Sequence, residues 1–142
     1  MNTYYVSDPN FLNSTLYREF IENNSSGGTL RIRAYAASQA IPIGGLKIVI
    51  STNYKNNIIV FYEGYTNESG VIEKINLPTP ELDQNNLDVP NYTTYEIKAT
   101  YIPDNINSIY KVNMYEDIVV IQNINIVPNS GFTNVVGDKI GS

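Results

Sequence analysis

Apolar and polar residues alternate along most of the chain from residue 28 onward. Leu30, Ile32 and Ala34 share one phase, while Arg31 and Arg33 occupy the other. A period of two puts successive side chains on opposite faces of a strand, so the pattern predicts strands with one buried face. Alternation or a continuous apolar run recurs in seven segments, residues 30–35, 46–51, 58–62, 71–77, 95–101, 110–114 and 118–127. Seven short strands separated by turn residues predict an all-β fold, a seven-strand antiparallel sandwich.

The first 27 residues follow a helical period instead. Leu12, Leu16 and Phe20 recur every four residues, with Tyr17 and Ile21 beside them. This spacing predicts a short helix, capped by a polar residue at 13–15 and ended by the polar run at 23–28. Such a helix is marginal alone in water, so we expect it to dock on its own domain or on a neighbour.

The chain therefore divides into three parts. We expect an N-terminal extension with a short helix over residues 1–27, a β-sandwich domain over 28–128 and a C-terminal tail over 129–142. Within the sandwich, residues 66–70 predict a tight turn in which Gly70 takes a positive φ. The apolar phase of the last strand runs through Val119 and Ile121 and then through Ile124 and Ile126, so it slips near Gln122, which predicts a β-bulge there.

Composition narrows the chemistry. The chain has 142 residues, a formal net charge of −5, no His and no Cys. Its acidity argues against nucleic acid as a partner, because phosphate neutralisation needs clustered Lys and Arg. Without imidazole or thiol it has no Ser–His–Asp triad, Cys–His dyad or His/Cys zinc site. We expect a protein that is not an enzyme, with no catalytic residue, no cofactor and no metal.

Two weaker chemical alternatives remain in the sequence. The long loop at residues 78–93 contains three carboxylates, those of Glu81, Asp83 and Asp88. They could do acid–base chemistry or bind calcium, but a solvated loop is the plainer interpretation. Tyrosines could stack on sugar rings, although Trp is absent. The candidate platform consists of Tyr92, Tyr95 and Tyr101, and core packing is the plainer interpretation for them.

Apolar residues also occur in the two otherwise polar terminal segments, and these are the candidate self-association residues. They are Tyr4, Tyr5, Val6 and Phe11 at the N-terminal end, and Phe132, Val135 and Val136 at the C-terminal end. A segment of this kind can add a strand to the open sheet edge of a neighbouring subunit. The alternative is that both segments pack on their own domain. No segment is long and apolar enough to span a membrane, and no signal peptide is visible.

Three segments resemble carboxypeptidase regulatory-like domains. They are residues 28–32 (GTLRI), 40–48 (AIPIGGLKI) and 66–70 (TNESG), which follow that family's order of strand, P-V-x-G-A turn, strand and T-D-x-x-G turn. The resemblance implies a transthyretin-like, seven-strand Greek-key sandwich. This chain departs from the pattern at Gly45 and Asn67, where the family usually has Ala and Asp.

Later segments resemble a clostridial and bacillar subgroup of that family, which occurs in spore-associated proteins. They are residues 77–80 (LPTP), 90–98 (PNYTTYEIK) and 115–128 (YEDIVVIQNINIVP). The subgroup includes the pro-region of the spore cortex-lytic enzyme. The resemblance implies a spore surface or coat protein, made in the mother-cell cytoplasm.

Together these observations predict a structural protein of the spore or cell surface that associates with itself, up to and including a filament. Two alternatives stay open. One is a pro-domain-like or accessory module that binds a cortex peptidoglycan hydrolase, and the other is a module that binds peptidoglycan or another glycan.

Overall fold

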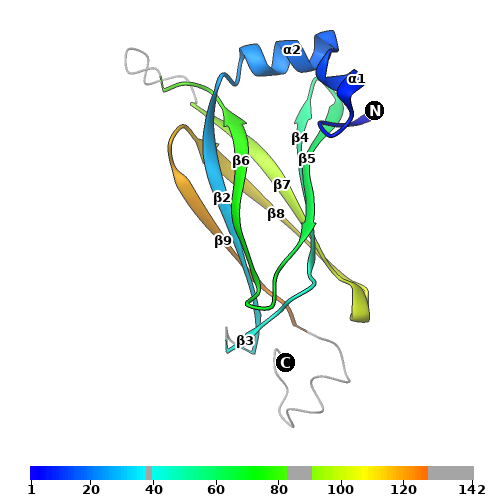
Figure 1. The fold of residues 1–142 in the computed structure, drawn as a ribbon, viewed down its shortest axis with the longest axis vertical. Coiled ribbons are helices and arrows are strands. Elements are labelled where there is room, and N and C mark those ends of the chain that lie inside the picture. Colours follow the sequence, from blue (N-terminus) through cyan, green and yellow to red (C-terminus); the bar gives the residue numbers. More distant parts are fainter. Residues whose placement is uncertain (38–39, 83–90, 128–142) are drawn as a thin grey trace.

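The computed structural model describes residues 1–37, 40–82 and 91–127, and within them strands dominate (Figure 1). The N-terminal elements are β1 (Thr3–Tyr5), α1 (Pro9–Leu12) and α2 (Thr15–Glu22). The strands that follow are β2 (Ser26–Ala36), β3 (Ile41–Pro42), β4 (Lys47–Tyr54), β5 (Asn57–Tyr65), β6 (Val71–Thr79) and β7 (Tyr92–Tyr101). A 3₁₀ turn at Ile102–Asp104 leads to β8 (Ile106–Tyr115) and β9 (Val119–Asn125).

The strands form two sheets, which confirms the predicted all-β sandwich with a short N-terminal helical region. The larger sheet has the order β1-β5-β4-β7-β8, and the smaller one joins β3, β2 and β6, with β9 also paired to β2. Each of the seven predicted strands is present, and β1 and β3 are two short additions that the alternation does not reveal. Two pairings, β1 with β5 and β2 with β9, are parallel, so the antiparallel expectation is wrong at these places.

The main core lies between the sheets and follows the predicted phase. Leu30, Ile32, Ile48, Ile50 and Ile97 are each fully buried. Burial of each such side chain contributes roughly 1.5–3 kcal/mol, and this is the main stabilisation of the sandwich. One aromatic ring also lies in this core: the Tyr95 hydroxyl donates to the Pro78 carbonyl at 2.5 Å, and burial raises the pKa of the Tyr95 phenol well above its ordinary value.

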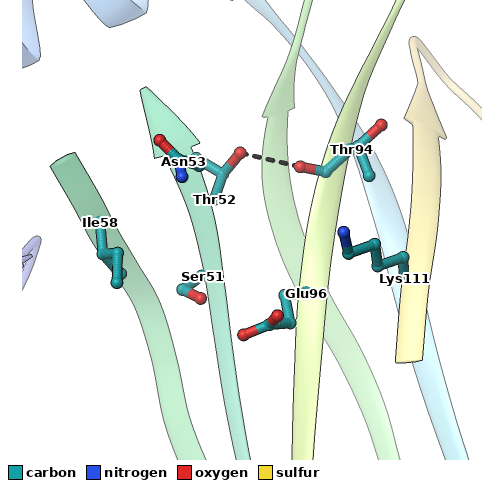
Figure 2. Close-up of a pocket in the computed structure, with 7 residues that line it drawn as sticks. All are labelled: Ser51, Thr52, Asn53, Ile58, Thr94, Glu96 and Lys111. Atoms are coloured by element: carbon teal, nitrogen blue, oxygen red, sulfur yellow. Dashed lines mark hydrogen bonds between the residues drawn. The ribbon is translucent and has the colours of Figure 1, made fainter. Parts of the chain in front are cut away.

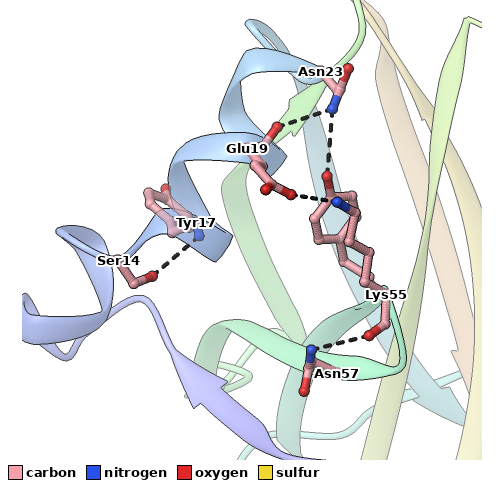
Figure 3. Close-up of polar contacts among 7 residues, drawn as sticks. Ser14, Tyr17, Glu19, Asn23, Lys55 and Asn57 are labelled. Atoms are coloured by element: carbon pink, nitrogen blue, oxygen red, sulfur yellow. Dashed lines mark hydrogen bonds and ion pairs between the residues drawn. The ribbon is translucent and has the colours of Figure 1, made fainter.

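Two helices stand where the period predicted one. Ser14 interrupts the helical run and caps α2 by accepting the Tyr17 backbone N–H at 3.2 Å (Figure 3). A Ser N-cap satisfies a donor that the helix itself cannot, so the break stabilises α2 rather than weakening it. Further along α2, the Glu19 carboxylate meets the Lys55 ammonium at 2.5 Å, a surface ion pair that contributes little.

The two helices cover the end of the sandwich at which β4 ends and β5 begins (Figure 1). Beneath them lies a second apolar cluster of Phe11, Phe20 and Ile59, all buried. The Phe20 ring packs 5.5 Å from the ring of Phe61, which in turn meets Tyr95 at 5.6 Å. The helices thus dock on their own domain, and aromatic contacts connect their cluster to the main core.

The predicted turn at residues 66–70 is confirmed, and its glycine is required. Gly70 has a φ of +77°, and a Cβ there would lie 2.4 Å from the Ala34 carbonyl oxygen. The bulge predicted near Gln122 is wrong, because β9 pairs with β2 in unbroken register. The irregularities lie instead between Leu30 and Ile32 and between Ile50 and Ser51. Within the described ranges, no helix is long and apolar enough to cross a bilayer.

Phe20 is the residue on which the docking of α2 depends most, so its truncation tests the helical cover. We expect Phe20→Ala to lower the free energy of unfolding by about 3–5 kcal/mol, because it removes a buried aromatic ring and leaves a cavity. Leu12→Ala is the matched control, since Leu12 is 43% exposed and should change stability little. Urea unfolding monitored by circular dichroism measures both. Equal, small effects would contradict the docking of α2.

Candidate functional site

The carboxylates singled out in the long loop do not form a site among the described residues. The Glu81 carboxylate accepts a hydrogen bond from the Ser25 hydroxyl at 2.9 Å, whereas Asp83 and Asp88 lie outside the described residues. No group of three or more acidic side chains that could hold a metal ion occurs in residues 1–37, 40–82 and 91–127. Of the three loop carboxylates, the structure therefore places only that of Glu81, beside Ser25.

A shallow hollow of about 330 Å³ lies on the outer face of the larger sheet (Figure 2). Its lining is mostly polar and consists of Ser51, Thr52, Asn53, Ile58, Thr94, Glu96 and Lys111. Glu96 and Lys111 stand opposite each other on β7 and β8, and the Thr52 hydroxyl donates to the Thr94 carbonyl at 2.8 Å. Such a lining can bind a polar ligand through hydroxyl, amide and charged groups. The alternation marks Thr94 and Glu96 as outward-facing, but it does not say which strands are neighbours, so the hollow itself was missed.

The candidate tyrosine platform is not assembled on one surface. Tyr95 is fully buried, Tyr101 is half-buried against the core, and only Tyr92 is exposed, with its ring 5.4 Å from that of Tyr115. Tyr95 therefore cannot stack on a sugar, and the core interpretation is correct for it.

The four N-terminal candidate residues all have partners within their own chain. Tyr4 and Tyr5 belong to β1, which pairs with β5, and the Val6 N–H donates to the Val60 carbonyl at 3.0 Å. Phe11 is buried, and its ring stacks on Tyr4 at 4.9 Å. As placed here, these residues are part of the domain rather than a free arm. Phe132, Val135 and Val136 lie outside the described residues.

The outer face of β9 carries an apolar strip that the sequence pattern predicts to be buried. Val119 is 60% exposed and Ile121 is 46% exposed, whereas Val120 and Ile124 point inward. Because the expected bulge is absent, one phase runs the whole length of β9 and places Val119 and Ile121 outside. We name Val119 and Ile121 the β9 strip. The apolar residues Ile118 and Val127, at the two ends of β9, are also exposed.

The turn between β8 and β9 is fastened by Glu116. Its carboxylate accepts the Leu82 backbone N–H and the Ser26 hydroxyl, both at 2.8 Å. These two hydrogen bonds lower the pKa of the Glu116 carboxyl below its ordinary value, since they favour the charged form. The turn is thereby fastened both to the segment after β6 and to the start of β2.

Comparison with known proteins finds similarity of fold alone. No family model matches the chain, and no curated protein matches it. Among solved structures, 5-hydroxyisourate hydrolase of Klebsiella pneumoniae is 14% identical with a TM-score of 0.44, over 72% of this chain and 92% of that one. Sea bream transthyretin in complex with thyroxine is 12% identical with a TM-score of 0.43, over 71% of this chain and 88% of that one.

Catechol 1,2-dioxygenase from Pseudomonas arvilla C-1 is 7% identical with a TM-score of 0.45, over 87% of this chain and 56% of that one. Enzymes and a binding protein thus share this general arrangement, and at these TM-scores the similarity carries no argument about activity. The chain is similar to transthyretin-like folds.

Glu116 makes the free energy of unfolding depend on pH in a way that can be tested. Because its pKa is lower in the folded protein, its contribution to stability is present above the ordinary pKa of 4.5 and is lost as the pH falls through the folded value. We expect Glu116→Gln to lower the free energy of unfolding at neutral pH and to reduce its decline below pH 4.5. Urea unfolding at neutral and acid pH measures this. Glu68→Gln, at an exposed turn residue, is the control, and an identical acid decline in both variants would contradict the role of Glu116.

Proposed function

We propose that this protein is a non-catalytic structural component of the spore or cell surface that works by associating with itself. The observation that carries the proposal is the β9 strip, because exposed apolar residues on a sheet edge are typical of interaction surfaces. The residues that resemble spore-associated domains supply the cellular context. Self-association through the C-terminal residues Phe132, Val135 and Val136, which lie outside the described residues, is the alternative to the β9 strip.

The N-terminal candidate residues are not assigned a role in self-association. Tyr4 and Phe11 are already engaged in the cluster under α1 and α2, so a subunit that offered them to a neighbour would first have to release contacts in its own domain. Release of this kind exposes buried aromatic area, which costs several kcal/mol. We therefore assign self-association to the C-terminal half of the chain.

Self-association is tested on the full chain. We expect sedimentation velocity over a range of concentrations to show species larger than the monomer, and negative-stain microscopy to show whether they extend into fibres. An antibody raised against the chain should label the surface of intact spores of the producing organism. A monomer at every concentration would refute the proposal, whatever the labelling.

Glycan binding is the second candidate, and the polar hollow favours it over the tyrosine platform. Hydroxyl, amide and carboxylate groups in one depression suit a ligand rich in hydroxyl groups, such as peptidoglycan. We expect the protein to co-sediment with purified cortex peptidoglycan and Glu96→Ala to weaken this binding. Glu68→Ala, on a distant turn, serves as the control. If both variants bind like the wild type, the hollow is not a glycan site.

A further inference from the structure

We propose that β9 is the self-association edge, and that it pairs antiparallel with β9 of a second copy of this chain. This inference rests on the proposed self-association and specifies where it occurs.

The free edge of β9 offers unpaired backbone groups. The hydrogen bonds at the two ends of its ladder with β2 run from the Thr29 N–H to the Ile118 carbonyl at 3.0 Å and from the Ile126 N–H to the Tyr35 carbonyl at 2.8 Å. In a parallel ladder, alternate residues bond to the same neighbour. The N–H and C=O groups of the even-numbered residues of β9 therefore point to β2. Those of the odd-numbered residues point to the free edge. Among the described residues no strand pairs with that edge.

The same odd-numbered residues carry the exposed apolar side chains. Val119 and Ile121 lie on the outer face, followed by Asn123 and Asn125, so backbone groups and apolar surface are offered together. A strand that paired here would satisfy the backbone and cover the β9 strip in one step.

The other edges of the described sheets each carry at least one protective feature, and β9 carries none. Edge strands are commonly protected by short length, charge, proline or bulges. β1 has three residues and β3 has two. β6 contains Glu73 and Pro78 and lies against a register shift in β2, and β8 contains Lys111. β9 has seven residues, with no charge, no proline and no register shift.

Charge favours a second copy in antiparallel orientation. Two chains of net charge −5 repel, so contact is least costly along a strand without charge. A parallel pairing in matched register would set Asp117, just before β9, beside the Asp117 of the other copy. With Ile121 opposite Ile121, the antiparallel pairing instead sets Asp117 opposite Asn125, at the end of β9 near which β2 carries Arg33. This register also joins the two exposed isoleucines.

A charge placed on the edge tests the proposal. We expect Ile121→Lys to raise the dissociation constant of the self-associated species about tenfold or more, as measured by sedimentation. Ile109→Lys is the matched control, because Ile109 is 61% exposed on β8 and its replacement should leave association unchanged. Val135→Lys tests the C-terminal segment as the alternative occupant of the edge, and it too should leave association unchanged.

A cysteine tests the register, and the chain contains no other cysteine to interfere. Directly opposite, hydrogen-bonded residues of an antiparallel pair have Cα atoms about 5.5 Å apart, within the range of a disulfide. We expect Ile121→Cys, and not Ile109→Cys, to form a covalent dimer under mild oxidation.

The outcomes separate this inference from the proposed function. If the wild type associates but Ile121→Lys associates equally well, the β9 edge is wrong and self-association stands. If Val135→Lys abolishes association, the C-terminal segment occupies the edge and β9–β9 pairing is wrong. A monomeric wild type refutes both proposals.

Discussion

The unequal size of the two sheets is the constraint on which the rest of this structure depends. The larger sheet has more strands than the smaller one, and Ile59 on its β5 is buried in a separate cluster outside the core between the sheets, so it needs another partner. The two N-terminal helices supply it with Phe11 and Phe20, and in doing so they make residues 1–22 part of the domain. Apolar residues in that segment thus have a structural cause, independent of any binding partner.

The sequence predicts this architecture well because most of its information is local. A period of two fixes which residues of each strand face inward, and the buried Leu30, Ile48 and Ile97 follow it. Pairing partners are not local. Nothing in the pattern shows that β1 joins β5 or that β9 runs parallel to β2, because both pairings join residues far apart in the sequence.

The candidate surfaces depend even more on which strands are neighbours, and the sequence pattern does not show this. The hollow on the larger sheet needs β4, β5, β7 and β8 side by side, and that order cannot be read from any one strand. The β9 strip was misassigned for a different reason. An apolar residue in a strand is expected to be buried, and burial of Val119 and Ile121 required a bulge in β9. Their exposure instead points to an interaction surface.

The corner before β9 explains why its edge is presented in a fixed orientation. β2 passes so close to the end of β8 that a Cβ on Gly28 would lie 2.4 Å from the Tyr115 carbonyl oxygen. The Asp117 N–H donates to the Gly27 carbonyl at 2.9 Å, and Glu116 fastens the same turn to Ser26. Because these contacts hold the corner before any partner arrives, pairing along β9 need not pay for ordering the strand. A glycine with no chemistry of its own thereby helps to determine where the protein can make contact.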